Sequence, residues 1–173
     1  VYVNNEWLEE ARTLRQVLPE SRAAGDSTTD SDSSEVLGGK IATYAGQAIA
    51  GTEADVIYQS CRYDLGGYRL AMPNGSYRVT LKFCEPHFDS AAKRVCDVKL
   101  QGKTVLYQFD IFAKVGKFTA YDRSFDGITV TDGTLTIDII NRVSMACISG
   151  IEVTGQNFSK RVNCGGPPWK GYQ

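Results

Sequence analysis

The feature that most limits what this chain can fold into is a two-residue alternation of apolar and polar side chains from about residue 55. It is clearest in residues 77–83, 96–100 and 135–139. Such alternation is typical of strands that turn one face to a core and the other to water. Several short strands without intervening helices predict an all-β fold: an antiparallel β-sandwich of the jelly-roll kind over residues 36–166. Turn signals separate the strands, at Pro73-Asn74-Gly75, Gln101-Gly102, Asp126-Gly127 and Asp132-Gly133.

The first 35 residues follow different patterns. Apolar residues recur at helical spacing over residues 5–18, and Pro19 follows them, which predicts a short N-terminal helix within a helical segment, 1–24. Residues 25–35 are almost entirely polar and are expected to form a linker or loop. At the other end, residues 167–173 are expected to be a C-terminal tail or the start of a following domain.

Charge and hydropathy argue against two classes of partner. Residues 1–35 hold eight acids and three bases, so the rest of the chain carries a net charge of +4 within a total of −1. This positive charge is small, and the Lys and Arg residues are not clustered in the sequence. We therefore expect no nucleic-acid partner. No run approaches the roughly 20 apolar residues of a membrane span, and we expect no membrane partner. The first residues also lack the layout of a signal peptide.

No two of the five cysteines have the CxxC spacing. The sequence therefore lacks the motif that usually indicates a zinc ribbon or a thioredoxin-type site. Cys84, Cys96 and Cys147 fall in strand-like segments, where a free cysteine acts as a small buried hydrophobe. We therefore expect mostly reduced, structural cysteines. One disulfide stays possible, and the sequence does not identify its partners.

A catalytic site finds little support in the sequence. The chain has one histidine, His87, and contains no GxSxG, GxGxxG or P-loop motif. A lone histidine makes a poor metal site. Glu85 and Asp110 are among the acids that could form a glycosidase pair, but the sequence does not give their separation. We expect a non-catalytic domain without metal or cofactor.

Nine tyrosines are many for 173 residues, and several fall at predicted strand ends or in loops. The C–H face of a pyranose packs on an aromatic ring while polar side chains hydrogen-bond its hydroxyls. This composition permits a sugar-binding module without identifying one. The aromatic residues in such positions are Tyr44, Tyr58, Tyr63, Tyr68, Phe88 and Tyr121.

Five blocks, in chain order, resemble malectin and malectin-like domains. They cover residues 56–63, 74–85, 93–103, 109–116 and 148–153, and so extend over most of the predicted sandwich. The first block ends in Arg62-Tyr63 and the second in Phe83-Cys84-Glu85. The resemblance implies a β-sandwich lectin domain that binds glucose-containing or related saccharides in a cleft built from loops.

The resemblance also implies site residues. The family's cleft tyrosine falls on Tyr63, its aromatic pair on His87 and Phe88, and its aspartate near Asn141. His87 and Asn141 depart from the family pattern, so the sugar preference does not carry over. The expected carbohydrate-binding set has two stacking rings and four further side chains that could donate or accept hydrogen bonds: Tyr63, Phe88, His87, Arg62, Asn141 and Tyr44.

The family's opening strand is missing before Tyr58, while residues 161–168 at the C-terminus resemble it closely. Either the domain is circularly permuted and takes its first strand from the end of the chain, or this segment begins a second, truncated repeat. We favour permutation, because a missing strand would leave a bare sheet edge.

These observations predict a non-catalytic carbohydrate-binding module that binds a glucan or other saccharide. Its expected partner is an attached catalytic domain, most plausibly a glycoside hydrolase, in a secreted, periplasmic or cell-surface protein. One alternative is a structural, interdomain β-sandwich without a sugar site. Another is part of the catalytic unit of a glycoside hydrolase, with Glu85 or Asp110 in the reaction.

Overall fold

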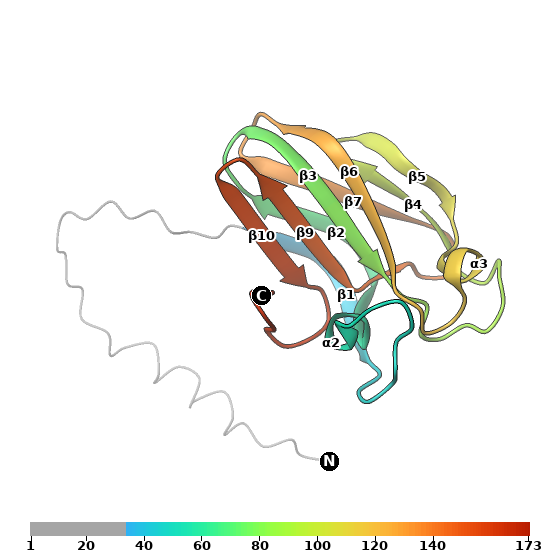
Figure 1. The fold of residues 1–173 in the computed structure, drawn as a ribbon. Coiled ribbons are helices and arrows are strands. Elements are labelled where there is room, and N and C mark those ends of the chain that lie inside the picture. The colour runs from blue at the N-terminus through green and yellow to red at the C-terminus, as the bar shows by residue number, and fades with distance from the viewer. Residues whose placement is uncertain (1–33) are drawn as a thin grey trace, which may run out of the picture. The chain divides into compact units, whose positions relative to one another are not determined.

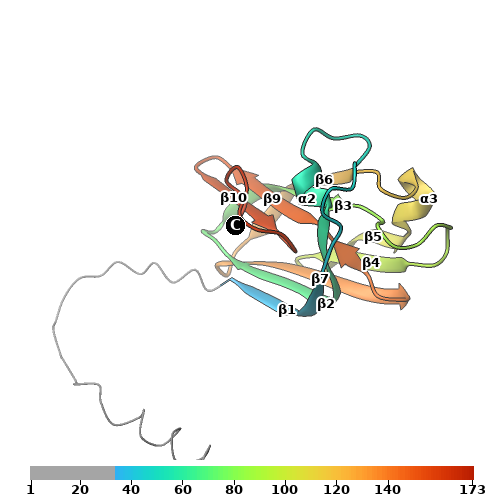
Figure 2. The same cartoon turned by 90° about the horizontal axis from the view of Figure 1, so that it is seen from below.

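The computed structural model describes residues 34–173. The helix expected over residues 5–18 and most of the expected linker lie outside the described residues. Ten strands form two sheets that Figure 2 shows as separate layers, so the predicted antiparallel β-sandwich is confirmed. No helix among residues 34–173 is long and apolar enough to cross a membrane.

Every pairing within the two sheets is antiparallel. The first sheet has the order β1-β2-β7-β4-β5, with β8 also paired to β2, and the second has the order β10-β9-β3-β6 (Figure 1). The strands of the first sheet are β1 (Glu35–Thr43), β2 (Ser60–Ala71), β7 (Thr134–Val143), β4 (Val95–Leu100), β5 (Lys103–Phe109) and β8 (Cys147–Ile148). Those of the second are β10 (Phe158–Asn163), β9 (Gly150–Gly155), β3 (Gly75–Phe83) and β6 (Tyr121–Val130).

The core lies between the sheets and is made by the alternation seen in the sequence. Val79, Leu81 and Phe83 of β3 and Leu135 and Ile137 of β7 are completely buried. All five cysteines are buried and unpaired, and Cys61, Cys96, Cys147 and Cys164 belong to this core. In these positions they pack as small, largely apolar side chains.

The C-terminal segment that resembles the family's opening strand lies in this same sandwich. β10 forms the edge of the second sheet beside β9, and the backbone N–H of Cys164 donates to the carbonyl of Ser149 (3.0 Å). A Cβ on Gly165 would lie 2.7 Å from the backbone of Cys61, so only glycine allows this approach. The segment thus occupies one edge of this sandwich, while circular permutation as its origin stays a prediction.

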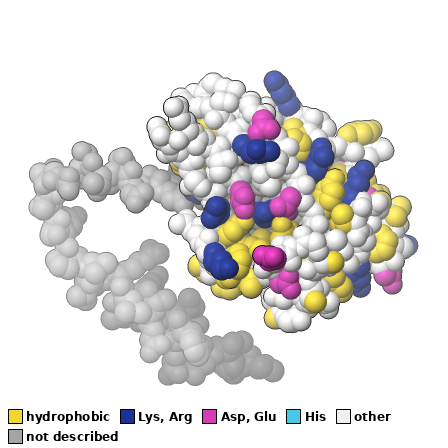
Figure 3. Space-filling model, in the orientation of Figure 1, with side chains coloured by type: hydrophobic (Ala, Val, Ile, Leu, Met, Phe, Trp, Pro, Cys, Tyr) yellow, Lys and Arg dark blue, Asp and Glu magenta, His cyan; other side chains and the backbone are white. Residues whose placement is uncertain are grey.

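Two short helices lie outside the sheets: α2 (Asp55–Tyr58) and α3 (Ile111–Val115). α2 and the C-terminal residues pack over the second sheet, where Tyr58 and Tyr172 join Ile49, Ile57 and Cys84 in a smaller apolar cluster. On the face seen in Figure 3, acidic and basic side chains lie next to one another, without a large patch of one sign.

Candidate functional site

A pocket of about 270 Å³ opens where four chain segments meet. They are the end of β1, the start of β2, the β3–β4 connection and the β7–β8 connection. We call it the aromatic pocket, because four of its side chains carry aromatic rings. It is lined by Ala42, Tyr44, Cys61, Tyr63, Pro86, His87, Phe88, Arg94, Ser144 and Met145.

The pairing of β1 with β2 builds one wall. Ala42 lies opposite Cys61 and Lys40 opposite Tyr63 in the antiparallel register. Cys61 and Tyr63 are two residues apart on β2 and therefore share a face. Because Ala42 and Cys61 are small, open space is left beside the Tyr63 ring. The hydrogen bonding between the two segments continues beyond the end of β1, where the N–H of Tyr44 donates to the carbonyl of Gln59 (2.7 Å). This bond places Tyr44 at the rim of the pocket.

A buried carboxylate fixes the opposite wall. Glu85 is completely buried, and its Oε1 accepts hydrogen bonds from the N–H groups of His87 and Phe88, both at 3.0 Å. Its Oε2 accepts from Nε of Arg94 at 2.7 Å. A buried charge needs such partners to offset its desolvation. These bonds hold the turn that carries the two rings.

Arg94 links this turn to the β7–β8 connection. Its Nη1 donates to the carbonyl of Met145, and its guanidinium carbon lies 4.9 Å from the centroid of the Phe88 ring. Phe88 also meets His87 edge to face, with centroids 4.8 Å apart. The turn is therefore fixed by Glu85 and the Phe88 ring by Arg94 and His87, which favours a preformed pocket.

The floor of the pocket contains the thiol of Cys61, which interacts with Cys147 behind it. This contact lowers the pKa of Cys61 and raises that of Cys147. At the rim, burial raises the pKa of Tyr44, so its hydroxyl stays neutral and can donate or accept a hydrogen bond. Tyr44, Tyr63 and Phe88 are half-buried and His87 is exposed.

The structure brings together four of the six side chains singled out from the sequence: Tyr44, Tyr63, His87 and Phe88. It does not bring Arg62 or Asn141 into the pocket. Arg62 turns away from the face shared by Cys61 and Tyr63, because neighbouring side chains on a strand point to opposite faces. Its Nε donates to the carbonyl of Cys164 (3.3 Å).

Asn141 has a supporting position. Its Oδ1 accepts the N–H of Ala146 at 2.8 Å and so braces the connection that presents Ser144 and Met145 to the pocket. The sequence reasoning missed these two residues and also Arg94. Arg94 lies in a matched block, but its pairing with Glu85 depends on how the intervening loop folds.

The two carboxylates considered for catalysis are engaged elsewhere. Glu85 is closed off from solvent, as described above. Asp110 caps α3, where its Oδ1 accepts the N–H of Ala113 at 3.0 Å and its Oδ2 accepts the N–H of Ala92. Among residues 34–173, no group of three His, Cys, Asp or Glu side chains is arranged to hold a metal ion.

Comparison with known proteins gives relatives for both sequence and fold. A family profile described as "Malectin domain" matches residues 19–157. Malectin-B of Xenopus laevis is 34% identical over 88 residues, which cover 49% of this chain and 32% of that protein. Human Malectin is 33% identical over 88 residues, covering 49% of this chain and 30% of the relative. The match thus spans about a third of these relatives' length.

Two solved structures share the fold. A β-glucuronidase of Bacteroides uniformis superimposes with a TM-score of 0.66 at 23% identity, covering 76% of this chain and 15% of that one. The extracellular domain of ANXUR1 from Arabidopsis thaliana gives a TM-score of 0.60 at 14% identity. The match covers 76% of this chain and 42% of the ANXUR1 chain. At these identities the likeness concerns the fold alone.

Proposed function

Because the chain belongs to the malectin family, we propose that it is a non-catalytic carbohydrate-binding module whose aromatic pocket holds a sugar residue. One observation carries the proposal: segments far apart in the sequence bring Tyr44, Tyr63, His87 and Phe88 to one pocket of about 270 Å³. Half-buried rings beside hydroxyl and imidazole groups offer both kinds of contact that a pyranose makes, stacking and hydrogen bonding.

Each side chain has a role in this proposal. The rings of Tyr63 and Phe88 pack on the C–H faces of the sugar. The Tyr44 hydroxyl and the His87 imidazole at the rim hydrogen-bond its hydroxyl groups. Arg94 holds Phe88 in place through its contact with the ring and does not need to touch the ligand. Asn141 acts through the connection that it braces.

The proposal extends to the setting of the module. We propose that it keeps an attached glycoside hydrolase close to its polysaccharide in an extracytoplasmic protein, whether secreted, periplasmic or cell-surface. A tethered binding site raises the effective concentration of the enzyme at its substrate even when the single site is weak. The β-glucuronidase of Bacteroides uniformis, in which 15% of a longer chain has this fold, gives a precedent for such an arrangement.

Affinity electrophoresis through gels containing different polysaccharides tests the proposal, with a glycan array to widen the search. We expect retardation by at least one glucan or related glycan. Tyr63→Ala should weaken binding at least about tenfold, because loss of a central aromatic contact costs 2 kcal/mol or more. Tyr107→Ala is the matched control: Tyr107 lies on β5, is 67% exposed and does not line the pocket.

Two results would contradict the proposal. If a folded wild-type chain binds none of a broad panel of glycans, an interdomain β-sandwich without a sugar site becomes the better description. If binding occurs but Tyr63→Ala and Tyr107→Ala behave alike, the sugar binds elsewhere on the molecule. Thermal unfolding of both variants shows whether any loss of binding reflects loss of the fold.

A further inference from the structure

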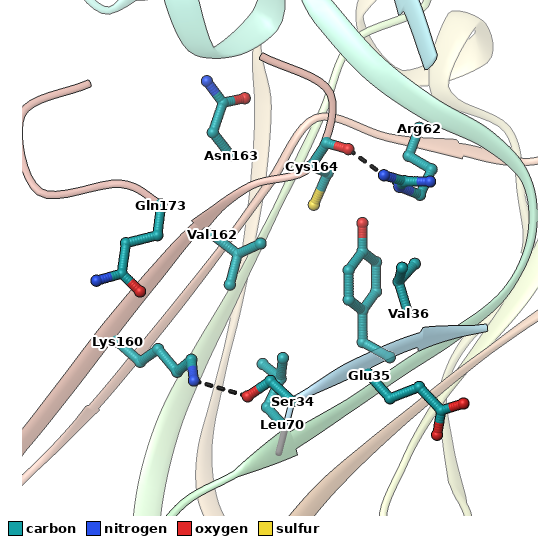
Figure 4. Close-up of a pocket in the computed structure, with 11 residues that line it drawn as sticks. Ser34, Glu35, Val36, Arg62, Leu70, Lys160, Val162, Asn163, Cys164 and Gln173 are labelled. Carbon is teal, nitrogen blue, oxygen red and sulfur yellow. Dashed lines mark hydrogen bonds between the residues drawn. The ribbon is translucent and has the colours of Figure 1, made fainter. Parts of the chain in front are cut away.

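A second pocket, of about 230 Å³, opens at the edge of the sandwich where β1 and β2 of one sheet face β10 of the other. Figure 4 shows its side chains, and we call it the edge pocket. Val36, Leu70 and Val162 provide apolar walls, while Arg62, Tyr68 and Lys160 provide polar groups. None of its lining residues belongs to the aromatic pocket.

Tyr68 is the most unusual of these residues. Its side chain lines the pocket and is only 4% exposed, and within residues 34–173 its hydroxyl makes no hydrogen bond of normal geometry, although Cys164 and Arg62 lie beside it. Burial raises the pKa of Tyr68, and neighbouring Cys164 raises it further, so the hydroxyl keeps its proton. A buried hydroxyl without a partner is costly. An acceptor in the pocket would relieve that cost.

Arg62 lies beside this hydroxyl, close enough for its charge to act on the pKa of Tyr68. Its one hydrogen bond within the described chain is from Nε to the carbonyl of Cys164, drawn dashed in Figure 4. The two Nη groups remain for a ligand. Gly39 makes room for the Arg62 stem, since a Cβ there would lie 2.9 Å from its Cγ.

Two further charged side chains line the pocket. Lys160 contributes a second cation, and its Nζ donates to Oγ of Ser34 at 2.7 Å. Glu35 is the one acid in the lining, and Figure 4 shows its carboxylate turned away from Arg62 and Cys164.

From this arrangement we propose that the edge pocket binds the carboxylate of a small ligand. The planar guanidinium of Arg62 pairs with a carboxylate through two parallel hydrogen bonds, the geometry for which arginine is suited. The Tyr68 hydroxyl donates a third hydrogen bond to the same group. The ligand's carbon skeleton packs on the apolar walls. The carboxylate can belong to an acidic sugar or to a simple organic acid.

Calorimetric titration of the full chain tests the proposal, and Tyr63→Ala serves as background so that the aromatic pocket does not contribute. The probes are D-glucuronate, D-glucose, lactate and inorganic phosphate. D-glucuronate and D-glucose differ only in the carboxylate. We expect glucuronate to bind and glucose not to bind. Lactate binding as well as glucuronate identifies a general carboxylate site, and binding of glucuronate alone identifies an acidic-sugar site.

Two variants assign the binding to the edge pocket. Arg62→Gln should weaken it about tenfold or more, because a charge-assisted bidentate pair is lost. Tyr68→Phe preserves the ring and should weaken binding about threefold to tenfold through one hydrogen bond. Thermal unfolding in the absence of ligand checks the fold of both, and Tyr68→Phe should be at least as stable as its parent.

Other outcomes overturn the inference. If neither glucuronate nor lactate binds, or if binding is unchanged in Arg62→Gln and Tyr68→Phe, the edge pocket is only a solvated gap between the sheets. Tighter binding of phosphate than of either carboxylate would contradict the proposed ligand chemistry. The inference does not rest on the aromatic pocket, because every titration is made with that pocket disabled.

Discussion

Two polar networks near the C-terminal end of β3 hold covering segments in place, and they differ in burial. The Glu85 network consists of Glu85, Arg94 and the N–H groups of His87 and Phe88. Its carboxylate is completely buried, and the guanidine side chain is 9% exposed. The Lys82 network lies on the outer face of the second sheet, where Lys82 pairs with Asp122 at 2.7 Å and with Glu152 at 3.3 Å.

The Lys82 network docks covering segments and stays accessible to water. The Tyr58 hydroxyl donates to Asp122 at 2.5 Å and fastens α2, while the Tyr172 hydroxyl donates to Glu152 and fastens the C-terminal residues. The side chains of Asp122 and Glu152 remain 41% and 27% exposed, whereas that of Lys82 is 12% exposed, close to the 9% of Arg94. The two networks therefore differ mainly in their acids: a fully buried carboxylate holds the turn that carries His87 and Phe88, and partly solvated carboxylates fasten α2 and the C-terminal residues.

The largest expected effect is that of Glu85→Gln. The substitution leaves the Arg94 guanidinium without its counter-charge in a buried position, which should cost about 3–5 kcal/mol of unfolding free energy. Urea denaturation followed by tryptophan fluorescence measures it. Sugar binding should also fall at temperatures where the variant is folded, because the glutamine amide can still accept the N–H groups of His87 and Phe88 but no longer accepts from Arg94, which weakens the anchor of the turn. A loss below about 1 kcal/mol would contradict the role of this network.

The strands that were predicted correctly are those in which the local pattern decides the structure. Residues 77–83, 96–100 and 135–139 fall within β3, β4 and β7 because their alternation determines which face is buried. β1 carried little such signal. It contains Gly38-Gly39, shifts register against β2 beside Gly38, and exposes Ile41 to 55%. Its place depends on pairing with β2, which is not encoded in β1 alone.

A smaller effect is expected in the Lys82 network. Tyr58→Phe removes one hydrogen bond to a partly solvated carboxylate and should cost about 1–2 kcal/mol in urea denaturation. Sugar binding by the aromatic pocket should stay within a factor of about two, because neither Tyr58 nor Asp122 lines it. A loss of binding comparable to that of Glu85→Gln would remove the distinction between the two networks.

In the candidate site, too, the features that depend on local sequence could be predicted, and those that depend on tertiary contacts could not. The rings of Tyr63, His87 and Phe88 were found through resemblance to a family, since nothing in the local sequence separates them from core aromatics. Alternation on β2 already implies that Arg62 and Tyr63 face opposite sides. The pairing of Glu85 with Arg94 could not be foreseen, because it depends on the path of the loop between them.

The smallest expected effect is a pH dependence that arises in the Lys82 network. Burial by itself would raise the pKa of Glu152, but hydrogen bonds from Tyr172 and Lys82 outweigh it and lower the pKa below the ordinary value of 4.5. A lowered pKa contributes stability above about pH 4.5, which is lost as the pH falls through the folded-state value. We expect this contribution to be below about 1 kcal/mol, given the exposure of the group.

NMR titration of the Glu152 carboxyl carbon checks this prediction directly. Tyr172→Phe should move its pKa upward and should flatten the dependence of stability on pH below about pH 4.5. An unchanged pKa in the variant would mean that the Tyr172 hydroxyl does not stabilise the carboxylate.

The central claim is that Tyr44, Tyr63, His87 and Phe88 form one saccharide site, and NMR chemical-shift mapping tests it most directly. The glycan retained best in affinity electrophoresis would be titrated into labelled protein. We expect the largest shifts on these four residues and on the Ser144–Met145 connection, with the Lys82 network unaffected. Shifts confined to other surfaces, or no shifts in the folded protein with any glycan, would contradict this claim.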